Sequence, residues 1–181
     1  MTPKEKLLGE AIDYFATHGI GDASLRSIAT GLGTSHRMLI YHFGSREGLL
    51  AEVVRAVEAQ QRASLAMFTG DDDLTVAERS QRYWDGVVEA TLTYGRLFFE
   101  LSAHAMQKRP HTEGLRGDLI AVWLPPLTEL FVSGGIDPAE APAYARLSLA
   151  ATRGLLFDLL LTGDREGVDE AIVLLNRFLQ T

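Results

Sequence analysis

Residues 24–49 read SLRSIATGLGTSHRMLIYHFGSREGL, and the serines and glycines in this stretch predict where helices begin and end. Ser24, Ser35 and Ser45 each precede a run with helical periodicity, and serine hydroxyls commonly accept a backbone hydrogen bond at helix N-termini. A glycine separates each run from the next. Since glycine readily adopts the left-handed backbone that ends helices, each of these glycines predicts a helix end. The stretch therefore predicts two short helices, followed by the start of a longer one.

A helix-turn-helix pattern follows, because two short helices joined by a glycine-containing turn form that motif. The second helix of the motif, expected over residues 35–42, is the one that enters the major groove of DNA. At about 100° per residue, Leu39 and Phe43 share an inward face, whereas Arg37 and Tyr41 lie on the opposite side. The outward face therefore predicts contact with DNA, and Arg37 there offers a two-pronged donor to guanine.

Other side chains near this second helix suit particular parts of a duplex. His36 can donate or accept at a base edge, and Met38 can contact a thymine methyl group. Tyr41 and His42 suit phosphate oxygens. The N-terminus of the next helix, with Arg46 in its first turn, offers backbone N–H groups to a further phosphate.

Charge is distributed unevenly along the chain, whose net charge is −7 over 181 residues. Five basic and five acidic side chains cancel within residues 1–48, so the negative charge falls on the remainder. This asymmetry is expected if only the N-terminal end approaches phosphate. The sequence has no cysteine, no secretory leader and no apolar run long enough to span a bilayer. These absences predict a cytoplasmic protein without disulfides, Cys-ligated zinc or a membrane partner.

Helical periodicity extends over the rest of the chain, and no alternating strand pattern competes with it. A capping box at residues 75–78 predicts the start of a fifth helix, and Pro125-Pro126 must kink or split the helix that contains it. A later helix begins either at Pro138 or only at Pro142, since proline favours the first helical turn. The apolar stripes predict an all-α fold of about nine helices, carried by residues 7–15, 25–32, 35–43, 45–70, 75–88, 97–106, 115–131, 142–159 and 168–179.

The last two predicted helices are apolar over broad arcs, which burial within one chain also explains. Ala150, Ala151 and Gly154 are small enough to let a second helix approach closely, as in a two-fold four-helix interface. The helix expected over residues 35–42 can contact only a few base pairs of DNA, so useful affinity needs two half-sites. We therefore expect a homodimer that pairs through the last two helices. Arg153 and Asp158 lie in the first of them, and each must find a partner or reach solvent.

The motif residues resemble the signature of the tetracycline-repressor (TetR) family of bacterial transcription regulators. The resemblance rests on residues 24–29, 33–35 and 39–49, and it covers about the first 55 residues. It implies an N-terminal helix-turn-helix DNA-binding domain over residues 1–48. It also implies a C-terminal helical ligand-binding and dimerisation domain over residues 49–181.

Three positions depart from the common pattern of that family. Ile40 stands where tyrosine is frequent, which puts one phosphate contact in doubt and offers an apolar groove contact instead. Thr34 and Arg46 stand where valine and lysine are frequent, and neither change breaks the pattern. The candidate DNA-contacting residues are Arg26, Ser35, His36, Arg37, Met38, Ile40, Tyr41, His42 and Arg46.

Aromatic and polar residues of the middle helices are candidates for an effector cavity, although core packing also explains most of them. Their composition favours a small, mostly apolar or aromatic effector, oriented by Tyr83, Thr91 or His104. The full candidate set is Tyr83, Trp84, Thr91, Phe98, Phe99, His104 and Trp123. No cofactor or metal is expected, because Glu100 and His104 lack di-iron spacing and residues 71–73 lack the calcium-loop pattern.

Together these patterns predict a ligand-responsive regulator, most simply a repressor that a small molecule releases from a near-palindromic DNA operator. Activation stays open, because the sign of regulation depends on where the operator lies relative to the promoter. One alternative keeps the fold as a ligand-binding or interaction module without DNA binding. An enzyme is a further alternative, which no nucleophile–base pair, metal cluster or phosphate loop in the sequence supports.

Overall fold

The computed structural model describes residues 2–19, 23–65 and 75–179, and all the regular structure in these ranges is helical. The prediction of an all-α fold is therefore confirmed. Within these ranges, no helix is both long and apolar enough to cross a membrane. The helices are α1 (Pro3–His18), α2 (Leu25–Gly31), α3 (His36–Phe43), α4 (Arg46–Ser64), α5 (Val76–Met106), α6 (Glu113–Asp118), α7 (Leu124–Ser133), α8 (Ala141–Thr162) and α9 (Arg165–Leu179), with the 3-10 helix η2 (Pro110–Thr112) before α6.

The predicted caps are present at the helix starts. Ser24, Ser35 and Ser45 precede α2, α3 and α4, and each hydroxyl accepts a hydrogen bond from the backbone N–H three residues later, at 3.0–3.2 Å. Thr75 and Glu78 form the predicted capping box at the start of α5. These bonds satisfy N–H groups that have no partner within the helix, so each cap fixes where its helix begins.

The helix α5 corrects one predicted boundary. It runs without interruption through residues 76–106, so the prediction of a separate helix over residues 97–106 is wrong. The glycine between the two predicted segments, Gly95, does not end the helix. A β-carbon there would lie only 2.8 Å from Leu160 Cδ1, so the glycine allows α8 to approach α5 closely.

The proline pair splits its predicted helix, as expected. Pro125 and Pro126 lie in the first turn of α7, where a missing backbone N–H costs nothing, and α6 ends several residues earlier. The predicted end of the fourth helix near Gly70 lies outside the described residues.

The start of α8 follows the second of the two alternatives. The helix begins at Ala141, with Pro142 in its first turn. The preceding residues form a turn instead, in which Asp137 Oδ1 accepts a hydrogen bond from the backbone N–H of Ala139 at 2.8 Å.

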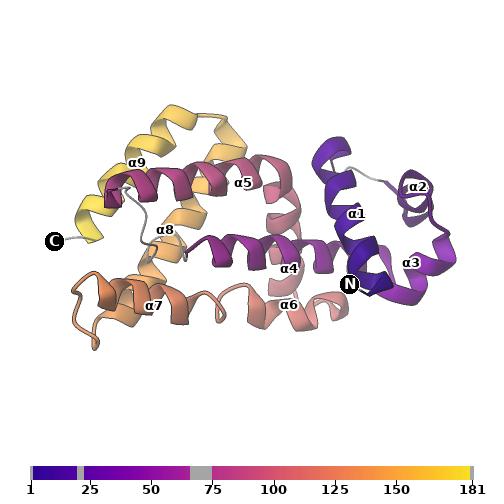
Figure 1. The fold of residues 1–181 in the computed structure, drawn as a ribbon, viewed down its shortest axis with the longest axis horizontal. Coiled ribbons are helices and arrows are strands. Elements are labelled where there is room, and N and C mark those ends of the chain that lie inside the picture. The colour runs from indigo at the N-terminus through magenta and orange to yellow at the C-terminus, as the bar shows by residue number, and fades with distance from the viewer. Residues whose placement is uncertain (1, 20–22, 66–74, 180–181) are drawn as a thin grey trace.

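The N-terminal helices form one end of the molecule, and α4 runs from that end into the helical body (Figure 1). A continuous core joins the two parts, because Leu39 of α3 and Leu50 of α4 belong to the same buried cluster as Leu101 of α5 and Leu115 of α6. Helix α4 therefore crosses the boundary predicted between residues 48 and 49. The end of the molecule formed by α1, α2 and α3, called the reading end below, is packed against the rest of the chain.

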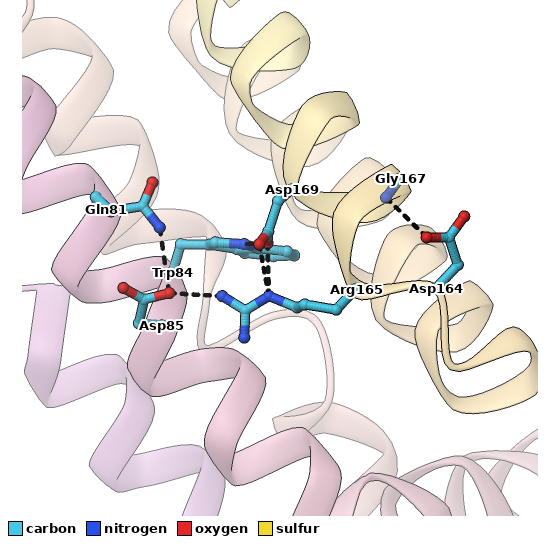
Figure 2. A network of polar contacts seen from close by, with 7 residues as sticks. All are labelled: Gln81, Trp84, Asp85, Asp164, Arg165, Gly167 and Asp169. Atoms are coloured by element: carbon cyan, nitrogen blue, oxygen red, sulfur yellow. Dashed lines mark hydrogen bonds and ion pairs between the residues drawn. The ribbon is translucent and has the colours of Figure 1, made fainter.

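A polar network fixes the start of α9 against α5 (Figure 2). Arg165 donates through Nη2 to Asp85 Oδ1 at 2.6 Å and through Nε to Asp169 Oδ2 at 2.7 Å. Trp84 Nε1 also donates to Asp169 Oδ1, at 2.5 Å. The network therefore joins the start of α9 to α5.

Gly48 allows α4 to begin close to the end of α3, because a β-carbon at this position would collide with the carbonyl oxygen of Phe43. We expect Gly48→Ala to lower the free energy of unfolding by about 1–3 kcal/mol, the usual cost of overpacking. Gly9→Ala is the matched control: Gly9 lies within α1 with nothing within 4 Å of an added β-carbon.

The control should gain about 0.5–1 kcal/mol, because alanine favours a helix over glycine. Urea unfolding monitored by circular dichroism measures both variants. Equal effects of the two substitutions would contradict the proposed close contact.

Candidate functional site

The reading helix α3 has one buried face and one exposed face. Leu39 is 0% exposed and Phe43 is 8% exposed, so both pack inward as their spacing predicted. Tyr41, on the other side, is 79% exposed. The polar face of α3 is therefore open to a large partner such as a duplex.

Most of the predicted DNA-contacting residues lie on this open surface. Met38 and Ile40 are each 41% exposed, so their apolar side chains are accessible for contact with a groove. Ser35 also caps α3, so its hydroxyl already accepts the N–H of Met38. The exposed candidates are Arg26, Ser35, His36, Arg37, Met38, Ile40 and Tyr41.

His42 and Arg46 are placed differently, since both are half-buried. The Nε2 atom of His42 is buried and has no hydrogen-bond partner among the described residues. Arg46 donates through Nε to the carbonyl oxygen of Ala23 at 2.8 Å. Arg46 therefore joins the start of α4 to the segment before α2, a positioning role that the sequence did not indicate.

A second candidate site is a cavity of about 120 Å³ in the helical body. Helices α4, α5, α7 and α8 contribute its walls, which are mostly apolar and aromatic. Its lining includes Glu58, Tyr83, Tyr94, Phe98, Trp123 and Arg153.

The cavity contains five of the seven predicted effector-contacting residues, namely Tyr83, Thr91, Phe98, Phe99 and Trp123. Trp84 and His104 are not among its lining residues. Trp84 follows Tyr83 on α5, so its side chain points about 100° away and packs with Leu159 and Val168. His104 lies in the last turn of α5, beyond the lining residues of that helix.

A buried ion pair at one end of the cavity joins α4 to α8. Arg153 Nη2 donates to Glu58 Oε2 at 2.8 Å, and each side chain is 16% exposed. Trp123 Nε1 donates to the same carboxylate oxygen at 2.6 Å. Arg153 Nη1 also donates to the carbonyl oxygen of Leu119, at 2.5 Å. Each charge is therefore satisfied by the ion pair and by at least one further hydrogen bond.

Aromatic rings complete the surroundings of this guanidinium. The Arg153 guanidinium lies 4.9 Å from the ring centroid of Phe98 and 5.9 Å from that of Trp123, within the range of cation–π attraction. Burial raises the pKa of the Glu58 carboxyl and lowers that of Arg153, while the attraction between them opposes both shifts. Burial also raises the pKa of the Tyr83 phenol, and the nearby Glu58 carboxylate raises it further.

From the sequence, Arg153 was expected to need a partner or to reach solvent, because it is a charged residue on an apolar helix. Arg153 finds its partner in Glu58, whereas Asp158 is exposed to solvent. Glu58 was not predicted, because it lies among other polar residues of α4 and its partner is 95 residues away.

Tyr94 connects the cavity directly to the N-terminal helices. Its ring lines the cavity, and its hydroxyl donates to the carbonyl oxygen of Ile12 in α1 at 3.0 Å. A displacement of Tyr94 at the cavity wall would therefore act directly on α1.

Metal-ligating groups are not clustered in the described part of the chain, where no set of three or more such side chains is close enough to hold an ion. Residues 71–73, considered above as a calcium loop, lie outside that part.

Comparison with known proteins finds a family match for the N-terminal residues. Residues 7–53 match the model of the tetR family of bacterial regulatory proteins. Over 75 residues the chain is 36% identical to the HTH-type transcriptional regulatory protein RaaS of Mycobacterium tuberculosis. That alignment covers 41% of this chain and 35% of RaaS, so it spans about a third of that relative. The resemblance of the N-terminal residues to the tetR family, which the sequence predicted, is therefore confirmed.

Solved structures share the fold over nearly the whole chain. A TetR transcriptional regulator from Legionella pneumophila has a TM-score of 0.69 and 23% identity, covering 99% of this chain and 96% of its own. The structure of BioQ with its natural double-stranded DNA operator has a TM-score of 0.63 and 21% identity, covering 99% of both chains. RaaS and the Legionella pneumophila protein are each described as regulators of transcription.

Breaking the buried ion pair from one side should destabilise the protein more than removing both charges. Arg153→Met leaves Glu58 without its ion-pair partner, and we expect a loss of about 3–5 kcal/mol in the free energy of unfolding. The double variant E58Q/R153M should recover much of that loss, because no unpaired charge remains and the new amide oxygen at position 58 can still accept from Trp123. Urea unfolding of the single and double variants measures the difference, and equal losses would contradict it.

Proposed function

We propose that this protein is a homodimeric repressor of transcription in the cytoplasm, which a small, mostly apolar molecule releases from a near-palindromic operator. The exposed polar face of α3, within a tetR-family domain, is the observation that carries the proposal. Residues 1–48 act as the DNA-binding domain and residues 49–181 as the effector-binding and dimerisation domain.

Reading of DNA falls to the exposed residues of α3. Arg37, His36 and Met38 are all exposed, so we assign to Arg37 a contact with guanine and to His36 and Met38 contacts with base edges. Tyr41 binds phosphate, while Ile40 contacts the groove wall. Arg46 acts on phosphate and also holds the segment before α2, through its bond to Ala23. The fold shared with BioQ, whose structure contains an operator, supports this role.

A second copy of the chain is the expected partner of α8 and α9. On α8 an exposed stripe of small and apolar residues recurs at spacings of three and four, so it lies along one helix face. On α9 the neighbouring apolar side chains Val173, Leu174 and Phe178 are also exposed. The α8 stripe consists of Leu147, Ala150, Gly154, Phe157 and Leu161.

Such a stripe, rimmed by polar residues, is typical of a surface that another molecule covers. Isologous pairing of α8 and α9 with the same helices of a second copy forms a four-helix interface. It also brings two copies of α3 to one duplex, as two half-sites require.

The effector acts by favouring one of two dimer states, because a ligand shifts an equilibrium only by its difference in affinity for the states. Two elements link the cavity to the reading end. Helix α4 carries Glu58 at the cavity and begins beside α3, and Tyr94 lines the cavity while it is bonded to Ile12. Movement of either element changes the spacing of the two reading helices.

Operator binding can be measured by gel shift and fluorescence anisotropy with the DNA upstream of the protein's own gene. Affinity should fall with salt, with a log–log slope of about −0.9 per phosphate neutralised. Arg37→Ala should cost about 1–3 kcal/mol and relax sequence preference, whereas Arg46→Ala should weaken binding to all sequences alike. Arg96→Ala, an exposed change on α5 with the same effect on net charge, is the control and should bind as the wild type does.

Retention of full operator affinity by both Arg37→Ala and Arg46→Ala would refute the assigned contacts. A folded wild-type protein that retards no DNA from its own upstream region would instead favour the ligand-binding module without DNA binding.

The dimer surface has its own test. Leu161 is 71% exposed in the α8 stripe, and Leu92 is 62% exposed on α5. Leu161→Glu should convert the dimer to a monomer, because it places a charge in an apolar interface, while Leu92→Glu should leave the dimer intact. Light scattering coupled to size-exclusion chromatography gives the mass of each. A wild-type monomer, or a dimer unaffected by Leu161→Glu, would exclude this interface.

A further inference from the structure

The cavity has a polar end whose charges cancel. Glu58 and Arg153 are the only charged side chains among the described residues that line it. They form an ion pair at 2.8 Å, and each also bonds to a neighbouring group, Trp123 Nε1 for the carboxylate and the carbonyl oxygen of Leu119 for the guanidinium. The two charged side chains that line the cavity are therefore already paired with each other.

We propose that this cavity selects uncharged aromatic molecules and rejects their anionic and cationic analogues, because the Glu58–Arg153 pair neutralises its polar end. The inference rests on the proposed function, since it names the chemical class of the effector for the same cavity.

Charge is rejected because a third ion has no partner there. An anion could approach Arg153 only by displacing or opposing Glu58, and a cation could approach Glu58 only by displacing Arg153. In either case one charge is left unpaired beside side chains that are only 16% exposed, which weakens binding of the ion. A neutral ligand leaves the pair intact.

Neutral polar groups can still orient such a ligand. Gln61, Thr91, Ser148 and Thr152 line the cavity and supply hydroxyl and amide groups that carry no charge. The raised pKa of Tyr83 keeps its phenol in the neutral form as well. A ligand with an amide, hydroxyl or carbonyl group can therefore form hydrogen bonds without disturbing the ion pair.

The walls favour an aromatic ring. Phe98 and Phe99 meet edge to face, with ring centroids 5.1 Å apart, and Tyr83, Tyr94 and Trp123 line the same space. Such faces and edges offer a ligand ring the offset and T-shaped contacts that aromatic pairs prefer. The volume of about 120 Å³ is close to that of an apolar cavity known to hold a single benzene ring, about 150 Å³.

The test uses three nearly isosteric probes: benzamide, benzoate and benzamidinium. They differ in charge but little in shape, so their order of affinity reports on charge alone. Titration calorimetry with the full-length wild type should show benzamide binding at least about tenfold more tightly than either ion, a factor that corresponds to 1.4 kcal/mol. Equal or tighter binding of benzoate or benzamidinium would overturn the proposal, as would no binding of any probe at millimolar concentration.

Variants of the ion pair should change the order of affinity of the three probes in opposite directions. Glu58→Gln leaves Arg153 unpaired and should make benzoate the tightest probe. Arg153→Met leaves Glu58 unpaired and should make benzamidinium the tightest probe. Glu100→Gln and Arg96→Met make the same charge changes on the exposed face of α5, outside the cavity, and should keep the wild-type order.

The double variant E58Q/R153M restores neutrality and should again prefer benzamide. If the single variants do not fold, the probe affinities of the wild type and of the double variant still decide the outcome. An order that stays the same in folded single variants would show that the pair does not set the selectivity.

Operator binding measured on the same preparations separates this inference from the proposed function. If the wild type binds its operator but the probes show no charge selectivity, the inference alone fails. If benzamide is selected but no DNA is retarded, the proposed function fails and the cavity's selectivity stands.

Discussion

The helix α4 belongs to both parts of the molecule, and the rest of the structure depends on how it is held. At its start, Ser45 caps it and Gly48 allows it to approach the end of α3. Along its length, Leu50 and Val53 are buried in the core shared with α1, α3 and α5. Further on, Glu58 enters the cavity and pairs with α8. The reading helix and the cavity wall are therefore attached to one rigid element.

The cavity lies between the reading end and the exposed face of α8, and both connections pass through buried groups. Arg153 lies on α8, so the ion pair links the proposed dimer helix to α4 through a single contact at 2.8 Å. Tyr94 adds a second link, from the cavity to α1. Because packed interiors resist continuous deformation, occupation of the cavity favours discrete rearrangements of these contacts over small local adjustments.

The acidic character of the chain does not conflict with a DNA partner. Basic and acidic groups cancel in residues 1–48, so the negative net charge falls on the remainder, where some basic side chains are paired with acidic ones. Arg55 is an example, since it pairs with Asp118 of α6 at 2.8 Å and with Glu52 at 3.0 Å. The field near α3 therefore arises from a few exposed cations such as Arg26 and Arg37, and net charge is a poor guide to it.

Much of the fold could be predicted from the sequence because helix caps and apolar periodicity act over a few residues. Ser35, Leu39 and Phe43 were sufficient to locate α3 and its buried face, and the exposed side followed from the same spacing. Contacts between distant segments could not be predicted in this way. Trp84 and Tyr83 are adjacent in the chain, yet Trp84 packs beside Leu159 and Val168 while Tyr83 lines the cavity.

The partner of Arg153 also could not be predicted from the sequence, because the two residues are brought together only by folding. Glu58 is 95 residues away, and nothing in the local pattern of either helix relates the two. Their pairing arises because α4 and α8 pack around one cavity, where each charge needs a partner once water is excluded. Short-range geometry thus places most helix starts and the buried face of α3, whereas the cavity and its charge balance arise when separate helices come together.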